Sequence, residues 1–486
     1  MPRLKYASVA RFVVIVGLFC LWLQIMLSAS GGGLYRDGDT NTTTKNLAES
    51  LTLPYQEAPT NSTVPEDIIT PFTEELMNAN ETSEQVLALV PPELRKYLTV
   101  HSKNSSSNST ERTASKNVTE IRKAIEREND AQYIYNEDRF GPVQNDTLII
   151  AIQVHTRLTY LRHLIVSLAQ AQDIDKVLLV FSHDYYDEEI NALVRSIDFT
   201  KVLQIFYPFS IQTHPHEFPG IDPNDCPRDV KLEQAVKLNC NNARHPDLHG
   251  HYREAKYTQT KHHWWWKANR IFNQLHCTTG HSGMVLFLEE DHYVVEDFVH
   301  MLNLLKKTSD KICPQCEILS LGTYLKTYQY HVNSNRVEIT PWHSSVHNMG
   351  FAFNKTVWTN IMSLQHLFCA YDDYNWDYSL LHLSQNRPGR EKFKVIMCKG
   401  PRVFHIGECG FHHKKANCNV STVISKVQKL VQGANPYLYP LQVTTTVTTG
   451  GAKLNKKLTK RNGGWGDIRD HELCANMTRR GRDPPN

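Results

Sequence analysis

The sequence lacks the glycine-rich motifs that usually mark a nucleotide site. No Gly-x-Gly-x-x-Gly follows the first predicted strand, so a dinucleotide cofactor is not expected. The absence of Gly-x-x-x-x-Gly-Lys-Ser/Thr argues against a P-loop nucleotide hydrolase. Net charge is low as well, at +3 over 486 residues, and gives no support for nucleic-acid binding. With 41% hydrophobic residues, the composition is that of a globular protein with one large or two modest domains.

An apolar run near the N-terminus predicts a membrane anchor. The run extends from Phe12 to Leu27 and is at the short end of what spans a bilayer. Basic residues precede it, which predicts a cytosolic tail over 1–11 and an anchor over 12–28. A cleaved signal peptide is the alternative, because Leu27-Ser28-Ala29-Ser30 offers small residues for cleavage. The length of the apolar core and the polar tether after it favour the uncleaved anchor.

Residues 29–132 are predicted to form a luminal stem. They are rich in Asn, Ser, Thr and Glu and have little apolar periodicity, so we expect a largely extended segment with one helical stretch near 120–129. A cluster of Asn-x-Ser/Thr sequons fits glycosylation in the secretory pathway. Residues 133–486 then form a luminal catalytic domain, which gives type II topology. The sequons are at Asn41, Asn61, Asn80, Asn104, Asn108 and Asn117 in the stem, and at Asn145, Asn354, Asn419 and Asn476 beyond it.

The cysteines agree with an oxidising compartment. Cys20 lies in the predicted anchor, and the ten that remain are an even number that suggests disulfides. Cys313-Pro314-Gln315-Cys316 could instead be a redox motif or half of a zinc site. Because no second Cys-x-x-Cys is present and zinc sites generally need four ligands, a structural disulfide is favoured.

Alternating strand and helix patterns predict an α/β fold with a Rossmann-like, mostly parallel sheet and helices on both faces. The first two strands end in Gln153–Arg157 and at Asp184, where a nucleotide is expected in such a fold. Strands are predicted over 147–155, 176–184, 202–207, 283–291 and 318–321, and helices over 158–172, 187–197, 258–275 and 295–308.

One predicted strand ends in an unusual cluster of charge. The apolar run that begins at Gly283 ends in Glu289-Glu290-Asp291-His292. Carboxylates at a strand end, with a basic region elsewhere in the chain, suggest a hard divalent cation that holds a phosphate-bearing substrate. A solvated acidic turn is the alternative for such a triplet taken alone.

Three further segments combine charge with aromatic or apolar residues. Thr260–Lys267 contains three consecutive tryptophans, which we expect partly to pack and partly to cover a groove. Tyr371–Tyr378 interleaves acids with aromatics, which suits a sugar ring with one apolar face, although acidic surface loops are common. His405 interrupts a short apolar strand, where a lone histidine is more often structural than a ligand.

From Thr147 through Cys474 the chain resembles the N-acetylglucosaminyltransferase II family. The matching segments are long and collinear, whereas the stem and anchor match only in general character. They are Phe181–Asp184, Gly250–Lys256, Gln259–Trp266, Phe287–Tyr293, His347–Gly350, Tyr371–Asp377, Gly410–Lys415 and Asn462–Cys474.

The resemblance implies a disulfide-stabilised GT-A glycosyltransferase domain with UDP-N-acetylglucosamine as donor and manganese as cofactor. The acceptor would be the α1,6-arm mannose of an N-glycan that already carries N-acetylglucosamine on its α1,3 arm, and the product a β1,2 linkage. The implied location is the Golgi membrane, with glycoproteins as partners, no nucleic acid, and a homodimer left open.

Residue roles carry over by position. The resemblance implies Asp291 and His405 as metal ligands and Asp377 as catalytic base. An arginine that contacts the donor in the family aligns with Tyr328, which puts that contact in doubt. The family's disulfides match as Cys226–Cys240, Cys313–Cys316, Cys369–Cys474 and Cys409–Cys418, which leaves Cys277 and Cys398 open. The donor pocket carries over onto Gln153, Val154, His155, Thr156, Arg157, Asp184, Gln259, Thr260, Lys261, His262 and His263.

The chemistry fits these roles. An α-linked donor and a β product require inversion in one displacement, with one general base for the acceptor hydroxyl. Asp377 lies beside Trp376 and Tyr378, where partial desolvation would raise its pKa. A carboxylate and an imidazole together suit manganese better than magnesium or calcium. Glu289 and Glu290 are expected behind the ligands or near the ribose and acceptor.

Two alternatives stay open at the sequence level. One is another inverting enzyme of the same fold, such as the transferase that acts on the α1,3 arm. The other is a catalytically inactive, lectin-like glycan-binding protein, which should lack a base or metal position. Asp291, Asp377 and His405 are all present.

Overall fold

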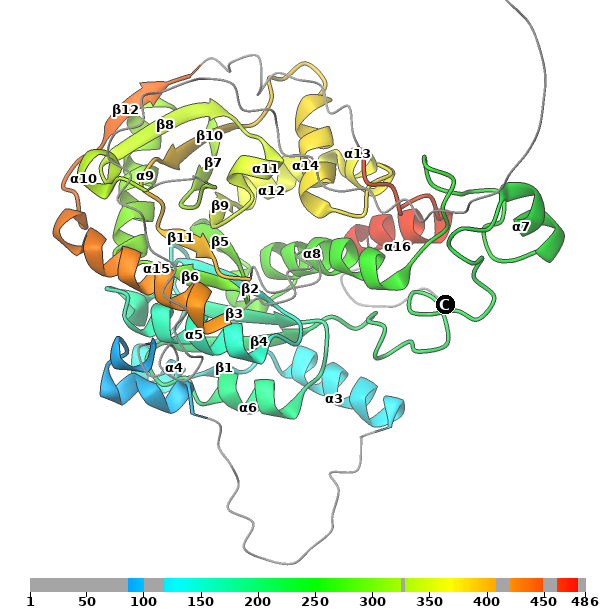
Figure 1. The fold of residues 1–486 in the computed structure, drawn as a ribbon, viewed down its shortest axis with the longest axis horizontal. Coiled ribbons are helices and arrows are strands. Elements are labelled where there is room, and N and C mark those ends of the chain that lie inside the picture. The colour runs from blue at the N-terminus through cyan, green and yellow to red at the C-terminus, as the bar shows by residue number, and fades with distance from the viewer. Residues whose placement is uncertain (1–85, 100–116, 325–327, 408–419, 449–460, 480–486) are drawn as a thin grey trace, which may run out of the picture. The chain divides into compact units, whose positions relative to one another are not determined.

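The computed structural model describes residues 86–99, 117–324, 328–407, 420–448 and 461–479 (Figure 1). The chain divides into two compact units, Met1–Glu74 and Glu75–Asn486, and all described residues belong to the second. The predicted tail and anchor therefore lie outside the described residues. Within the described ranges, no helix has the length and apolar character needed to cross a bilayer.

The core of the described part of the chain is a ten-stranded sheet in which four neighbouring strands are parallel. These four lie in the order β4 (Lys201–Phe206), β3 (Leu178–His183), β2 (Ile149–Val154) and β5 (Met284–Glu289). Every residue of β3 and β4 is buried, as expected for strands covered on both faces. The chain runs from β2 outward to β4 and then returns to β5 on the other side of β2.

The second half of the sheet is mixed. β9 (Phe351–Asn354) pairs antiparallel with both β5 and β7 (Cys316–Ser320), and β7 pairs parallel with β10. The predicted α/β class, with a large and mostly parallel sheet between helices, is confirmed. The other strands are β10 (Lys394–Cys398), β8 (Arg336–Pro341), β12 (Thr444–Val447) and, at the far edge beside β4, β1 (Ile134–Tyr135).

Helices cover both faces of this sheet because successive strand residues point to opposite sides. Ile150 and Ile152 pack with α5 (Leu158–Ala169), α6 (Glu188–Arg195) and α9 (Phe298–Ile312). Ile149 and Ala151 pack on the other face with α8 (Ala255–Asn273), α12 (Lys355–Ser363), α14 (Trp376–Gln385) and α16 (Ile468–Arg479). Short connecting helices are α4 (Glu137–Phe140), η2 (Ile174–Lys176), η3 (His276–Thr278), α10 (Tyr330–Asn333), α11 (Ser344–His347), α13 (Gln365–Cys369) and η4 (Asn435–Tyr437).

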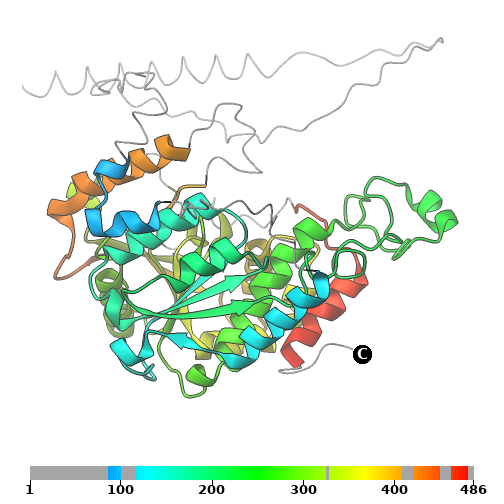
Figure 2. The same ribbon diagram turned by 90° about the horizontal axis from the view of Figure 1, so that it is seen from below.

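The three tryptophans of α8 correct one sequence expectation. Trp264, Trp265 and Trp266 are all buried in the same core, with exposed fractions of 1%, 0% and 7%, so none covers an open groove. The reason is that α8 is enclosed on several sides, by the sheet, by α14 and by α16, which lies alongside it in Figure 2. A helix enclosed in this way can bury consecutive side chains that point in different directions.

Folded structure also reaches into the segment predicted as stem. The helix expected near 120–129 is α3 (Val118–Ala131), which begins with a capping box between Asn117 and Glu120 and packs against β4. Upstream, η1 (Pro92–Tyr97) places Tyr97 in the main core with 1% exposure. The folded body therefore starts before residue 133, because these two elements bury apolar side chains on it.

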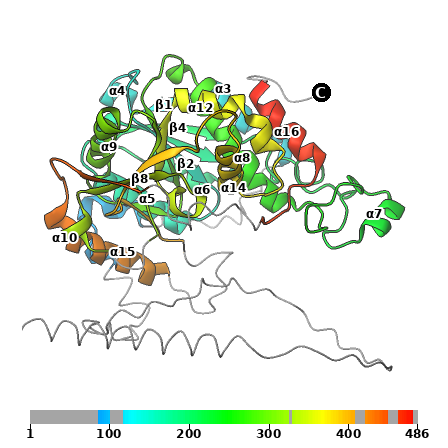
Figure 3. The same ribbon diagram turned by 90° about the horizontal axis from the view of Figure 1, so that it is seen from above.

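Two smaller features complete the fold. β6 (His292–Val294) and β11 (Val403–His405) form a two-stranded antiparallel sheet in which His292 is opposite His405. α15 (Val420–Ala434) shares a hydrophobic cluster with these strands through Ile424. The segment that carries α7 (Leu232–Leu238) extends away from the sheet (Figures 1 and 3).

Three of the predicted disulfides are present: Cys226–Cys240, Cys313–Cys316 and Cys369–Cys474. The Cys-x-x-Cys pair is thus a disulfide and not half of a zinc site. The predicted pair Cys409–Cys418 lies outside the described residues. Cys277 and Cys398 are unpaired, and Cys398 is buried.

Candidate active site

The sheet topology places several polar residues at one edge. Since the strand order reverses between β2 and β5, the crevice at their carboxyl ends is the expected ligand site of an open α/β sheet. β2 ends at Gln153-Val154, β3 is followed by Asp184, and β5 is followed by Glu290 and Asp291. Residues that are far apart in the sequence therefore meet at this edge.

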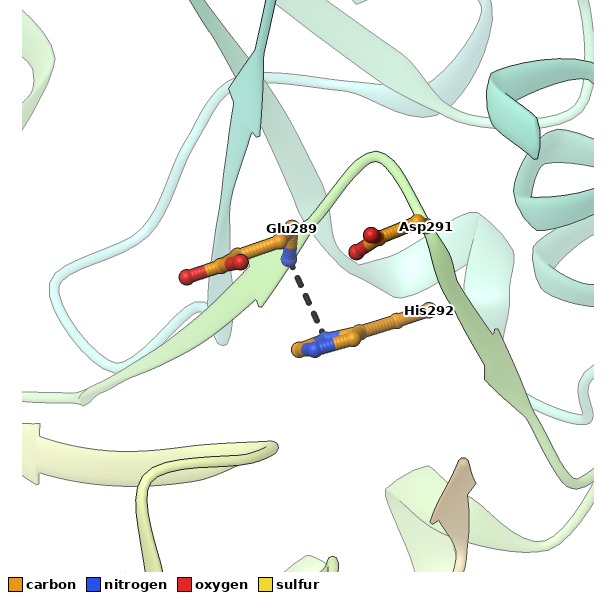
Figure 4. A group of neighbouring side chains, drawn as sticks. All are labelled: Glu289, Asp291 and His292. Atoms are coloured by element: carbon orange, nitrogen blue, oxygen red, sulfur yellow. Dashed lines mark hydrogen bonds between the residues drawn. The ribbon is translucent and has the colours of Figure 1, made fainter. Parts of the chain in front are cut away.

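The acidic cluster lies on the tight connection between β5 and β6. Figure 4 shows Glu289 at the end of β5, Asp291 on the turn and His292 at the start of β6, with all three side chains extending in one direction. Their potential ligand atoms lie within 4.8 Å of one another. The Nδ1 atom of His292 accepts the backbone N–H of Glu289 at 3.1 Å, so only its other nitrogen is available to a ligand.

Asp291 and His405, the predicted metal ligands, are neighbours. Oδ2 of Asp291 is 3.3 Å from Nε2 of His405, and Oδ1 is buried without a hydrogen-bond partner. Burial alone would raise the pKa of Asp291, but the hydrogen bond from His405 and the surrounding positive groups hold it below its usual range. A buried carboxylate with a free oxygen and an adjacent imidazole fits a divalent cation such as manganese.

Glu290 has a different task from Asp291. Its carboxylate accepts the backbone N–H of His155 at 2.8 Å and that of Arg157 at 3.3 Å. These bonds fix the loop after β2. Burial raises the pKa of Glu290 to about 7, although the His155 N–H opposes the shift.

Asp184 joins the predicted donor residues into one network. Its Oδ1 contacts Nδ1 of His155 at 2.6 Å, and its Oδ2 accepts Nε2 of Gln259 at 3.0 Å and lies 3.4 Å from Nδ1 of His263. Burial opposes ionisation of Asp184, but the hydrogen bonds to His155 and His263 hold its pKa far below the usual range. A fixed negative charge thus holds the groups around it in position.

Lys267 is a member of this site that sequence reasoning missed. It is buried, and its Nζ donates to Oε1 of Gln153 at 2.8 Å. Burial lowers its pKa to about 7, against the opposing charge of Glu289. The sequence does contain a pattern that points to Lys267, because Gln259, His263 and Lys267 are spaced by four residues and share one face of α8. The tryptophans between them obscured that periodicity.

Other predicted donor residues have their side chains elsewhere. Val154 is buried in the sheet core, whereas Thr156 and Thr260 are exposed. Lys261 donates to the backbone carbonyls of Tyr371 and Asp373 at 3.0 and 3.1 Å.

Two more positions face neighbours instead of the crevice. Nε2 of His262 contacts Oδ1 of Asp470 on α16 at 2.8 Å. Tyr328, at the position of the family's arginine, packs edge-on against Phe404 with ring centroids 5.3 Å apart.

Asp377, the predicted base, begins α14 in the same region. Its Oδ2 accepts the side-chain N–H of Asn348 at 3.1 Å. Burial raises the pKa of Asp377 to about 7, and the charge of Glu289 acts in the same direction. Burial raises the pKa of Tyr324, and the negative charges of Asp377 and Asp291 raise it further. The base therefore lies within electrostatic range of the acidic cluster at the end of β5.

The acids that precede Asp377 have structural partners. Asp372 accepts the backbone N–H of Leu248 at 2.6 Å and that of Trp465 at 3.0 Å. Asp373, which is fully buried, accepts the backbone N–H of Asn462 at 2.9 Å. They tie the loop before α14 to the segment before α16. A cavity of about 340 Å³ beside this loop combines tyrosines with carboxylates; its lining is Arg228, Asp247, His251, Tyr252, Glu254, Tyr257, Tyr374, Asn462 and Gly464.

Comparison with known proteins shows the family of this chain. A family model described as N-acetylglucosaminyltransferase II (MGAT2) matches residues 122–474. The chain is 44% identical to the rat alpha-1,6-mannosyl-glycoprotein 2-beta-N-acetylglucosaminyltransferase over 72% of its own length and 78% of that protein. Identity is 43% to the human protein of the same name, over 72% and 77%, and 33% to that of Arabidopsis thaliana, over 70% and 77%. The chain therefore belongs to the N-acetylglucosaminyltransferase II family.

Proposed function

We propose that this protein is an inverting glycosyltransferase that moves N-acetylglucosamine from UDP-N-acetylglucosamine onto the α1,6-arm mannose of an N-glycan, in β1,2 linkage. The observation that carries the proposal is the contact between Asp291 and His405 at the end of β5, with the buried carboxylate of Asp377 close enough for the charge of Glu289 to act on it. Such a site offers a base for the acceptor hydroxyl and, beside it, ligands for a divalent cation that would bind the diphosphate. Membership of the family supplies the substrate class.

Asp377 acts as the general base. Its raised pKa, about 7, lies near neutral pH, where a base combines a useful ionised fraction with high proton affinity. It takes the proton of the mannose hydroxyl as that oxygen attacks the anomeric carbon. The amide of Asn348 fixes the direction of the carboxylate. Because Asn348 donates to the ionised form, it also limits the rise of the pKa.

The donor lies along the ends of β2, β3 and β5. Asp291 and His405 would hold a divalent cation, with Glu289 and the free nitrogen of His292 beside them. When bound, such a cation neutralises charge on the leaving diphosphate. The network around Asp184 keeps His155 and Gln259 in place at the other side of the crevice.

The acceptor approaches from the side of the Asp372–Asp373 loop. The cavity there offers tyrosine faces for the apolar side of a sugar ring and carboxylates for its hydroxyls. The loop itself is held by Lys261 and by the segment before α16, so the surface is preformed.

The decisive test is an assay of purified enzyme with radiolabelled UDP-N-acetylglucosamine and two glycan acceptors. One acceptor has a free α1,6-arm mannose and N-acetylglucosamine on its α1,3 arm, and the other has a free α1,3-arm mannose. We expect transfer only to the former, lost in chelator and restored by manganese, with a β anomeric proton in the product. Preference for the α1,3 arm would favour the alternative enzyme, and binding without transfer would favour a lectin.

We also propose that residues 12–28 anchor the protein in the Golgi membrane with the catalytic domain in the lumen. The basic flank before the apolar run and the sequon-rich segment after it support this topology. The protein should then stay in the membrane fraction after carbonate extraction and shift on gels after removal of N-glycans. A soluble mature form that starts near Ser28–Gly31 would show a cleaved signal peptide instead.

A further inference from the structure

The carboxylate that is expected to hold the cation already has a cationic partner. Nη1 of Arg157 donates to Oδ2 of Asp291, the same oxygen that faces Nε2 of His405. The opposite oxygen of Asp291 is buried and has no partner. A guanidinium therefore compensates the charge of Asp291 on one side only.

The space around this ion pair is tightly bounded. A Cβ built on Gly407 would lie 2.0 Å from Oδ2 of Asp291 and 3.0 Å from Nη1 of Arg157. The backbone at Gly407 thus closes one side of the pair, and the backbone there cannot be displaced as easily as a side chain. A divalent cation that approaches Oδ2 meets the guanidinium first, and like charges at one carboxylate oxygen repel.

The side chain of Arg157 can leave without moving its own backbone. Glu290, not Asp291, accepts the N–H of Arg157 and that of His155, so the loop keeps its shape when the guanidinium turns. The guanidinium carbon already lies 5.9 Å from the ring centroid of Tyr160, and the side chain is 32% exposed. Arg157 thus pairs with Asp291 from a partly exposed position beside Tyr160 and is not enclosed by the core.

We propose that Arg157 is an internal cation that competes with the divalent metal for Asp291 and passes to the donor diphosphate when the metal binds. Guanidinium groups match phosphate oxygens as well as carboxylates. One side chain would therefore couple the two ligands. The metal takes Asp291 and frees the guanidinium for the diphosphate, and the diphosphate takes the guanidinium and frees Asp291 for the metal. The diphosphate part of this proposal rests on the proposed function; the competition at Asp291 does not.

The first test is metal binding without nucleotide. Free Mn²⁺ is measured by electron paramagnetic resonance during titration of the wild type, Arg157→Gln and, as a control of equal charge change, Arg127→Gln. Arg127 lies on α3 with its side chain 71% exposed. We expect the Kd of Mn²⁺ to fall by about tenfold in Arg157→Gln, since bonds between charged groups are stronger than neutral ones, and to stay unchanged in Arg127→Gln. An equal or higher Kd in Arg157→Gln overturns the proposal.

Arg157→Lys is a conservative control in case Arg157→Gln does not fold. Circular dichroism of each variant checks the fold directly. Lysine keeps the charge but not the planar fork, so an intermediate Kd for Mn²⁺ is expected. A Kd above that of the wild type would count against competition. Asp291→Asn should bind little Mn²⁺ at this site and defines the background of the titration.

The second test adds UDP. In the wild type, UDP should lower the Kd of Mn²⁺ by a larger factor than in Arg157→Gln, because only the wild type has a guanidinium to release; by linkage, Mn²⁺ changes UDP affinity by the same factor. Equal factors in both proteins would refute the transfer to diphosphate. If UDP has no effect in either protein while Arg157→Gln still binds Mn²⁺ more tightly, the proposed donor is wrong and the competition stands.

Discussion

At the scale of single residues, the acid proposed as the base has other partners than the two acids that precede it. Asp377 has one side-chain partner and a raised pKa, whereas Asp372 and Asp373 accept backbone N–H groups from distant segments. The three belong to one acidic segment and look alike in the sequence. Their hydrogen-bond partners assign them different roles.

Asp377→Asn should lower turnover by roughly 10²–10⁴-fold, because the amide keeps the shape of the side chain but cannot accept the proton. Binding of donor and manganese should change little. Asp372→Asn and Asp373→Asn should mainly weaken stability, since each loses an anionic acceptor of backbone N–H groups. Steady-state kinetics at saturating substrates decide: near-normal turnover in Asp377→Asn, with loss in either neighbour, would mean that the base is assigned to the wrong aspartate.

The same residue should affect how stability depends on pH. Folding raises the pKa of Asp377 from 3.8 to about 7, so its contribution to stability is full below pH 4 and is lost as pH rises through 7. In Asp377→Asn the side chain does not ionise, so stability is not lost in this way as pH rises. In urea unfolding, the variant should gain on the wild type between pH 4 and pH 8, by at most about 4 kcal/mol for three pKa units. A constant difference across that range would contradict the raised pKa.

At the scale of elements, the position of β11 depends on a buried ion pair. Nε and Nη2 of Arg402 donate to the two oxygens of Asp297 at 2.9 Å, and both residues are fully buried. Asp297 also accepts the backbone N–H of Tyr439 at 3.0 Å. The pair therefore joins the start of α9 to the strand that ends in His405 and to the segment after α15.

Arg402→Ala should destabilise the protein by about 3–5 kcal/mol, because it leaves a buried carboxylate without its partner. Lys176→Ala is the contrast: its ion pair with Asp173 is exposed and screened by solvent, so its loss should leave the free energy of unfolding nearly unchanged. Urea unfolding of the two variants gives the comparison. A double change, Arg402→Met with Asp297→Leu, should recover part of the loss; no recovery would mean that the cost is packing and not the unpaired charge.

How far the elements could be predicted depends on their burial. β2, β3, β4 and β5 are continuous apolar runs, and the sequence places them within about three residues. β8 alternates polar and apolar residues, and β10 contains the apolar run Val395–Cys398, so both carry strand patterns although neither strand was predicted. Their places in the sheet come from pairing with neighbours, which a local pattern does not contain.

The site was predictable in part for a related reason. Asp291 follows a clear strand, so its place at the sheet edge could be inferred from the sequence. His405 and Asp377 reach the crevice from 114 and 86 positions further along the chain, and only resemblance to the family pointed to them. Lys267 and the pairing of Arg157 with Asp291 depend on side-chain contacts between elements.

At the scale of the whole molecule, a disulfide and an ionic network join α16 to the rest of the core. Cys369–Cys474 links α13 to α16 across 105 positions. Asp470 on α16 is buried between His262 of α8 and Arg253, at 2.8 Å from each. The last helix of the described chain is thus held by covalent and ionic contacts at once.

Replacing Cys369 and Cys474 together by serine should lower the free energy of unfolding by about 2–5 kcal/mol, because the bond closes a long loop in the unfolded chain. The pair Cys313–Cys316 closes only 3 positions and should contribute less. Unfolding midpoints of the two serine double variants test this ordering. Equal losses of unfolding free energy in the two variants would mean that packing in the folded state, and not loop closure, sets the contribution of each disulfide.

The place of α16 in the sequence has a consequence for the order in which the protein is made. Leu473, Cys474 and Met477 complete the hydrophobic cluster that contains the tryptophans of α8, yet they follow every other member of that cluster along the chain. During synthesis, α8 leaves the ribosome about 200 residues before the helix that covers it. Until then one side of α8 stays open, and the nascent chain presents an aromatic surface that chaperones can bind.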